Sequence, residues 1–230
     1  MTKIKQMLEM QQQLNDATGG KGWENGFTDK GKVIDWPRCI YLEAAELVDS
    51  YPWKHWKNID AEPDYENIKI EIVDIWHFVM SEALRDYKTN QKGNIDKLAF
   101  DISKLVNYQQ FTKDVIPLDR DIYKQIGYVE DFIKTLFTTD DVLSLVDAFF
   151  KMAYKLQVNL DILYRLYVGK NILNKFRQEH GYKEGKYIKK WNGKEDNVVM
   201  QDILEKHPDV TPDELYEALE DAYRQVSSDK

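Results

Sequence analysis

The sequence predicts an all-α protein, a multi-helix bundle that contains an antiparallel helix pair. Apolar residues recur at helical spacing along most of the 230 residues, and no segment shows the bounded alternation of apolar and polar residues typical of a strand. Because 43% of the residues are hydrophobic and 13% aromatic, the chain can bury a sizeable core. We expect one domain over residues 1–230, with a hinge near 86–94 between two helical subregions.

Helix signals divide the first part of the chain into three helices. Pro37 occupies a position favoured in the first turn of a helix, and the second helix should end before Pro52 because the residue preceding a proline disfavours helix. A short connection should leave the second and third helices antiparallel. The expected elements are a helix at about Thr2–Ala17, a turn-rich loop at Lys21–Asp35, a helix from near Pro37 to before Pro52, and a helix from Pro63 to about Tyr87.

The second part of the chain is also expected to be helical. Thr211-Pro-Asp-Glu214 has the signature of a capping box and should open the last helix. Residues 181–197 are rich in Gly, Tyr and Lys, which predicts an ordered but mobile loop. The other expected helices are Ile95–Phe111, Asp121–Phe137, Asp140–Leu156 and Leu160–His180, whose apolar residues should form core and interface.

Composition excludes several classes of protein. The net charge of −8 argues against general nucleic-acid binding, and no apolar run is long enough to span a membrane. The single cysteine, Cys39, cannot form an internal disulfide, which indicates a reducing compartment. We therefore expect a cytoplasmic protein without nucleic-acid or membrane partners.

Charge is unevenly distributed along the chain. Residues 165–194 hold nine Lys and Arg and two Glu, a net charge of +7, which leaves −15 for the rest. A carboxylate-rich region and a cation-rich region in one protein suit a ligand that carries phosphates and arrives with metal ions. The alternative is a solvated basic face with no ligand.

Two acidic pairs predict a divalent-metal site. On the third expected helix the polar residues Glu71, Asp74 and His77 stand three apart on one stripe of an otherwise apolar segment. A buried carboxylate is costly unless it meets a cation or a full set of donors. The second helix supplies Glu43 and Glu46 at the same spacing, and four facing carboxylates suit Mg²⁺ better than zinc.

Two other metal sites fit poorly. A carboxylate-bridged di-iron bundle needs Glu-x-x-His on two helices, whereas this chain has only Asp74-x-x-His77. A His-Asp metallophosphohydrolase needs a His-Asp dipeptide, and none of the four histidines is followed by Asp.

Candidate ligand-binding residues lie elsewhere in the chain. Lys170, Asn174 and Arg177 share one helix face, and Tyr182, Lys183, Lys189 and Lys190 follow in the expected loop, where they could hold phosphate oxygens. Gln12 and Asn15 could pair with the edge of a nucleobase, although a solvated polar face is the alternative. Trp53 and Trp56 could stack on a base or cap a core.

Several motifs together resemble the dimeric dUTPases, which belong to the all-α nucleotide pyrophosphatases that include MazG-like proteins. The resemblance is carried by Glu43-Ala-Ala-Glu46 with Tyr51-Pro-Trp-Lys-His-Trp-Lys57, by Glu71-Ile-Val-Asp74-Ile-Trp-His77, and by the segments 169–177 and 181–197. The form found in Campylobacter-type bacteria and trypanosomatids is the most similar. The middle helices and the last thirty residues match only as helices.

The resemblance implies a homodimer that hydrolyses dUTP to dUMP and diphosphate, and dUDP to dUMP and phosphate. It implies a Mg²⁺ cluster at Glu43, Glu46, Glu71 and Asp74, with Glu46 as our candidate base for the attacking water. The base and sugar would be read by Gln12, Asn15, Trp56, His77 and Asn197. The phosphates would be held by Lys170, Asn174, Arg177, Tyr182 and Lys189.

Two alternatives remain open at this point. The same carboxylates could serve a MazG-like nucleoside triphosphate pyrophosphatase of broader specificity. The chain could also be a non-catalytic helical nucleotide-binding protein, although such a protein would be expected to have a broken ligand set.

Overall fold

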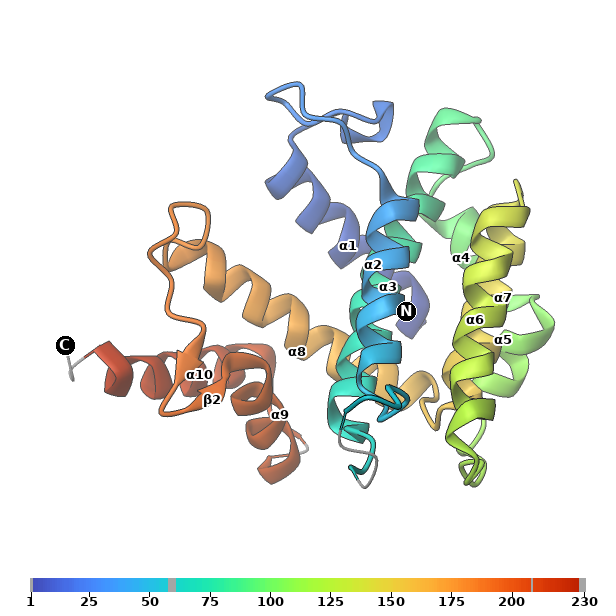
Figure 1. The fold of residues 1–230 in the computed structure, drawn as a ribbon. Coiled ribbons are helices and arrows are strands. Elements are labelled where there is room, and N and C mark those ends of the chain that lie inside the picture. Colours follow the sequence, from blue (N-terminus) through green and yellow to red (C-terminus); the bar gives the residue numbers. More distant parts are fainter. Residues whose placement is uncertain (1, 58–60, 208, 228–230) are drawn as a thin grey trace. The chain divides into compact units, whose positions relative to one another are not determined.

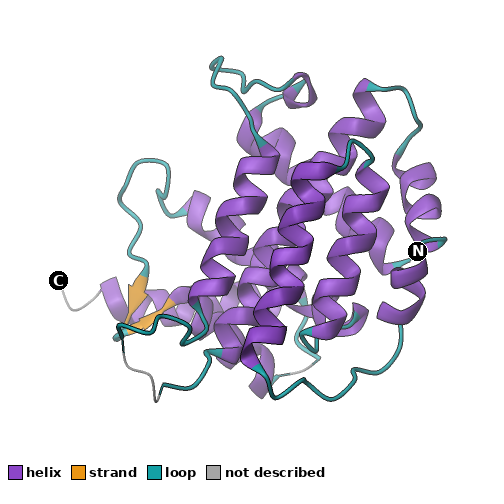
Figure 2. Cartoon of the chain, turned by 45° about the vertical axis from the view of Figure 1, so that its right-hand side comes forward, coloured by secondary structure: helices purple, strands orange, loops and turns teal. Residues whose placement is uncertain are grey.

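The computed structural model describes residues 2–57, 61–207 and 209–227 and confirms the all-α prediction (Figures 1 and 2). Contacts between Cα atoms divide the chain into two compact units, residues 1–164 and 165–230. The first unit contains α1 (Lys3–Gly19), the 3₁₀ turn η1 (Trp23–Asn25), α2 (Trp36–Asp49), α3 (Tyr65–Thr89), α4 (Ile95–Ser103), α5 (Val106–Phe111), α6 (Ile122–Thr138) and α7 (Val142–Lys155). Helix α8 (Leu160–Glu179) continues into the second unit, which contains β1 (Lys190–Trp191), β2 (Lys194–Glu195), α9 (Asp196–Lys206) and α10 (Pro212–Ser227).

The boundary between the units lies within α8, and the expected single domain with a hinge near 86–94 stays a prediction. None of the helices in the described ranges is long and apolar enough to cross a membrane.

Helix α3 is the centre of the first unit. It contacts α1, α2, α4 and α7, so most of its residues are buried, as its nearly continuous apolar sequence predicts. Trp76 is fully buried and stacks on Phe149 of α7 at 4.9 Å between ring centroids, with Phe150 at 5.3 Å. This aromatic core fixes α3 against α7.

Helices α2 and α3 lie side by side and run antiparallel, as predicted (Figure 1). Trp36 at the start of α2 stacks on Phe78 of α3 at 5.8 Å. At the other end, the Asp64 N–H, at the N-cap of α3, donates to the carbonyl of Ser50, the C-cap of α2, at 2.9 Å. These two contacts set the register, which places the middle of α2 opposite the first turns of α3.

The prediction of one continuous helix over 95–111 is wrong, because the segment forms two helices, α4 and α5. Leu105 is extended and becomes the N-cap of α5, where no side chain of its own caps the helix. Asp147 of α7 does so instead, accepting from the Asn107 backbone N–H at 2.9 Å and from its side-chain Nδ2 at 2.7 Å. The break therefore depends on a tertiary contact that helical periodicity does not encode.

A two-residue hairpin, β1 and β2, stands where the sequence predicts only a loop. Its turn is Asn192-Gly193, and both residues have positive φ, 49° and 84°. Asn-Gly is the residue pair that two-residue hairpin turns favour, so this signal was present in the sequence. Helix α9 begins directly after the hairpin, with the predicted site residue Asn197 in its first turn.

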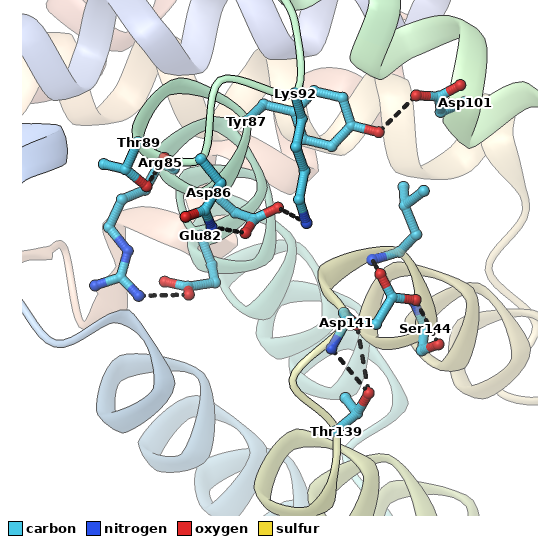
Figure 3. Close-up of polar contacts among 12 residues, drawn as sticks. Glu82, Arg85, Asp86, Tyr87, Thr89, Lys92, Asp101, Thr139, Asp141 and Ser144 are labelled. Atoms are coloured by element: carbon cyan, nitrogen blue, oxygen red, sulfur yellow. Dashed lines mark hydrogen bonds and ion pairs between the residues drawn. The ribbon is translucent and has the colours of Figure 1, made fainter.

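The C-terminal end of α3 is held by charged contacts (Figure 3). Lys92 pairs with Asp86 at 2.7 Å, and the Tyr87 hydroxyl donates to Asp101 of α4 at 2.7 Å. Glu82 pairs with Arg85, and burial raises the pKa of the Glu82 carboxyl. These contacts connect the end of α3 to the following turn and to α4.

The second unit has an ion pair at its centre. Arg177 of α8 donates through Nε and Nη2 to the two carboxylate oxygens of Asp196, both at 2.8 Å, and Asp196 has no exposed surface. Tyr187 also donates to Asp196 at 2.8 Å, and burial together with that carboxylate raises the pKa of the Tyr187 hydroxyl. Nearby, the buried ring of Phe176 contacts aromatic rings from the loop, from the hairpin and from α10.

The predicted capping box at the start of α10 is confirmed. The Thr211 backbone N–H donates to Glu214 Oε2 at 2.9 Å, and the Glu214 N–H donates back to Thr211 Oγ1 at 3.3 Å.

Replacing Phe149 with Ala should destabilise the protein by about 3–5 kcal/mol, because the change leaves a cavity beside Trp76. Phe100, which is 56% exposed, is the matched control, and Phe100→Ala should change stability by less than about 1 kcal/mol. Urea unfolding followed by far-UV circular dichroism measures both. Equal losses for the two variants would contradict the described core.

Replacing Asp196 with Ala should cost about 3–5 kcal/mol, because a buried guanidinium would lose its carboxylate. Asp202, which pairs with Lys194 on the surface at 2.6 Å, is the control, and Asp202→Ala should cost about 1 kcal/mol or less. Denaturant unfolding of the two variants, monitored by tryptophan fluorescence, distinguishes the buried pair from the surface pair. A near-neutral Asp196→Ala would mean that Arg177 does not depend on this partner.

Candidate functional site

Three carboxylates from α2 and α3 meet in the first unit. The register of the antiparallel pair brings Glu43, Glu46 and Glu71 together, and one ligand oxygen from each lies within 4.8 Å of the others. Three carboxylates at this distance repel one another unless a cation lies between them. The structure therefore contains a site with the charge and the spacing to hold a metal ion.

The three carboxylates of the cluster differ in their exposure to solvent. Glu71 is only 6% exposed, Glu43 is half-buried and Glu46 is exposed. Asn67, one turn before Glu71, donates through Nδ2 to Glu71 Oε1 at 3.0 Å and to Ser50 Oγ at 2.9 Å. The deepest carboxylate is thus oriented by an amide that also connects α3 to the end of α2.

The donors suit a hard divalent cation. All three are carboxylate oxygens, which Mg²⁺ and similar ions prefer, and the group contains neither cysteine nor histidine. Asp74, the fourth predicted ligand, is half-buried one turn after Glu71 and is not among the three residues within 4.8 Å. The structure therefore brings three of the four predicted ligands together directly.

A buried polar cluster joins α1 to α3 beside the core. Gln11 and Asn15 of α1 and His77 and Ser81 of α3 are all less than a tenth exposed. His77 Nδ1 lies 2.7 Å from Gln11 Oε1, and the Ser81 hydroxyl oxygen receives Nε2 of Gln11 at 3.1 Å and Nδ2 of Asn15 at 3.0 Å. We call these four residues the α1–α3 amide cluster.

Gln12 and Asn15, which the sequence pairs, have different hydrogen-bond partners. Gln12 donates to Asp16 at 3.0 Å and to Glu24 at 3.3 Å, and it lines a pocket of about 220 Å³. Gln11 takes the inner position. The signal was the helical spacing on α1, where the residues three, four, seven and eleven positions after Ile4 are Met7, Leu8, Gln11 and Asn15, all of them buried.

The predicted phosphate-binding residues of the second unit also gather. The Asn197 side-chain oxygen accepts from Lys170 at 2.9 Å and from Arg177 at 3.2 Å, and Arg177 also donates to Asn174 at 3.2 Å. Lys170 is 3% exposed and Arg177 8% exposed, so these two cations do not belong to a solvated basic face. The structure thus places Asn197, predicted as a base-binding residue, among the predicted phosphate-binding residues.

Two further predicted residues of the second unit lie outside these hydrogen bonds. The Tyr182 ring is 5.9 Å from the Arg177 guanidinium carbon and is exposed. Lys189 is exposed and pairs only loosely with Glu195, at 3.9 Å.

The paired tryptophans after α2 differ in exposure. Trp53 is half-buried, whereas Trp56 is 62% exposed, and their rings meet edge to face at 5.7 Å. Trp56 thus presents an aromatic surface to solvent on a loop that directly follows the helix of Glu43 and Glu46.

Comparison with known families agrees with this geometry. A sequence model of the family described as dUTPase matches residues 3–182, more than three quarters of the chain and all of α1 to α8. No individual curated protein matches the chain. The matched region contains the three-carboxylate cluster, the α1–α3 amide cluster and the cations of α8, and the chain belongs to the dUTPase family, the enzymes that hydrolyse dUTP to dUMP.

Proposed function

We propose that this dUTP diphosphatase depends on Mg²⁺ bound at Glu43, Glu46, Glu71 and Asp74, and that it also hydrolyses dUDP to dUMP and phosphate. The observation that carries the proposal is the group of three carboxylates within 4.8 Å on two antiparallel helices. Hydrolysis of a phosphoric anhydride needs neutralisation of phosphate charge, and this group of oxygens suits the ion that normally supplies it.

When bound, the metal would stabilise negative charge on phosphate oxygens and lower the pKa of a coordinated water. Glu46 is our candidate for accepting the proton of the attacking water, because it is the exposed member of the group. Water oxygen forms a new bond to one of the two phosphorus atoms that share the anhydride oxygen between the first and second phosphates. The bond from that phosphorus to the shared oxygen breaks, and the oxygen leaves with the electron pair on the other phosphate group. Glu71, buried and hydrogen-bonded to Asn67, would hold its position throughout.

The remaining predicted roles are part of the same proposal. Lys170, Asn174, Arg177, Tyr182 and Lys189 would hold phosphate oxygens through charge-assisted hydrogen bonds. Gln12, Asn15, Trp56 and Asn197 would bind the uracil base, and His77 would lie near the deoxyribose. The exposed ring of Trp56 supports stacking, and the burial of Asn15 and His77 supports recognition away from bulk water.

We also propose a homodimer in a reducing cytoplasm. Support comes from apolar side chains that remain exposed on α2 and α6, where the ring of Phe137 meets that of Tyr41 edge to face at 6.0 Å and Leu42 is half exposed. Exposed apolar side chains that lie together often mark an interface.

A pyrophosphatase of broader specificity is the alternative, and a substrate panel separates the two. With Mg²⁺ present, dUTP and dUDP should both yield dUMP, and kcat/KM for dCTP, dTTP and UTP should be lower by about 100-fold or more, as expected for a site that hydrogen-bonds its substrate. EDTA should abolish turnover. Equal rates on all substrates would favour the broader enzyme, and absence of dUMP would favour a non-catalytic binding protein.

Glu71→Gln tests the metal site directly, since it keeps the oxygen that accepts from Asn67 and removes the charge. Turnover should fall at least about 100-fold, a larger loss than is usual for residues that only support a ligand. Calorimetric titration with Mg²⁺ or Mn²⁺ should show weaker binding, and the metal-free variant should melt at a higher temperature because repulsion within the cluster is relieved.

The matched control is Glu66→Gln on the first turn of the same helix, where the carboxylate pairs with Lys69 outside the cluster. This variant should keep both activity and metal affinity. Unchanged metal binding in Glu71→Gln would contradict the proposed site.

A further inference from the structure

We propose that Ser81 is a positioning residue that sets the hydrogen-bond polarity of the α1–α3 amide cluster, and thereby the preference for uracil over cytosine. The inference rests on the proposed role of Asn15 and His77 in binding the base and the sugar. Ser81 itself contacts neither the base nor the sugar, because it has no exposed surface.

The polarity begins at a backbone carbonyl, which can only accept. Ser81 Oγ lies 2.8 Å from the carbonyl oxygen of His77, one helical turn earlier, so the single hydroxyl proton is donated there. A second possible acceptor, Asn15 Oδ1, lies 3.4 Å from Oγ, which is too long to compete. The oxygen of Ser81 is thereby left with two lone pairs and no proton for its other neighbours.

Both amides must then turn their nitrogens towards Ser81. Gln11 Nε2 lies 3.1 Å and Asn15 Nδ2 3.0 Å from the hydroxyl oxygen, so the two lone pairs are used by two donors. Gln11 Nε2 also donates to Asn15 Oδ1 at 2.9 Å, which is possible only when Asn15 has this same orientation. Each amide is therefore fixed by two hydrogen bonds. A flip of either amide would place donor against donor or acceptor against acceptor.

The orientation of Gln11 also determines which nitrogen of His77 carries the proton. With its nitrogen turned to Ser81, Gln11 points Oε1 at His77 Nδ1, 2.7 Å away, so Nδ1 must carry a proton. Neutral His77 is then the Nδ1–H tautomer, and its Nε2 is an acceptor. An acceptor at this position suits a sugar hydroxyl, which can donate to it.

Fixing the amide of Asn15 bears on base choice. Ser81 Oγ and Gln11 Nε2 occupy one N–H and one oxygen lone pair of Asn15, which leaves the second N–H of this amide as a donor in a fixed direction. The carbonyl O4 of uracil can accept from this N–H, whereas the amino group at the same position of cytosine cannot. A site in which Asn15 cannot flip therefore favours uracil, and the chain of bonds that starts at Ser81 prevents the flip.

The tautomer of His77 tests the polarity in the wild-type protein without any substrate. Long-range ¹H–¹⁵N NMR of the imidazole rings, recorded for the neutral ring and assigned with a His77→Asn variant, should show the proton on Nδ1. A proton on Nε2 would overturn the inference, whether or not the protein hydrolyses dUTP.

Ser81→Ala tests the consequence for specificity. It removes one oxygen from a helix, and it should lower the ratio of kcat/KM for dUTP to that for dCTP by roughly tenfold, the factor expected for one lost hydrogen bond. The His77 spectrum should change as well, from one tautomer to a mixture. Thr89→Ala is the matched control, because the Thr89 hydroxyl makes the same bond to a carbonyl one turn earlier on α3, at 2.8 Å, but on an exposed position.

A purely structural Ser81 would predict a lower melting temperature with an unchanged substrate ratio and an unchanged tautomer, and that result would contradict the inference. If the wild-type protein does not hydrolyse dUTP, the proposed function fails, and the NMR result still decides the polarity. If the wild type is selective and Ser81→Ala is equally selective, only the role of Ser81 fails.

Discussion

The burial of Glu71 in an otherwise apolar helix is the constraint on which the first unit depends. Its carboxylate cannot be moved to the surface without moving α3 out of the core, where Trp76 packs on Phe149. The α2–α3 register then places Glu43 and Glu46 beside it, although this brings like charges together. A protein that keeps such an arrangement gives up stability in the metal-free state for a strong site when a cation binds.

A second buried charge plays a similar part in the second unit. Arg177 and Asp196 satisfy each other with two hydrogen bonds, and Tyr187, Asn174 and Asn197 add further hydrogen bonds to the pair. Because Asp196 begins α9 and Arg177 lies on α8, the pair fixes the two helices and the hairpin between them. The guanidinium is thereby held in a defined orientation.

How far the site could be predicted depended on the kind of signal. Carboxylates on an apolar helix are conspicuous, because their burial is costly whatever surrounds them, and three of the four were found together. The burial of a neutral amide is less costly, so the sequence does not reveal which amides are buried. Gln11 and Gln12 are the same residue type, and only the helical phase of α1 decides which of them faces Ser81. Asn197 was assigned by resemblance to the base, yet its described partners are Lys170 and Arg177.

The sequence by itself determined the all-α class, the antiparallel pair, the capping box of α10 and the acidic cluster, because each depends on local periodicity, on short-range hydrogen bonds or on the cost of burying charge. The tertiary structure decided where the helix over 95–111 breaks, since the cap of α5 comes from Asp147 of another helix. It also decided the orientation of the buried amides, because a chain of hydrogen bonds that starts at one backbone carbonyl links residues far apart in the sequence. Such contacts exist only once the helices have packed.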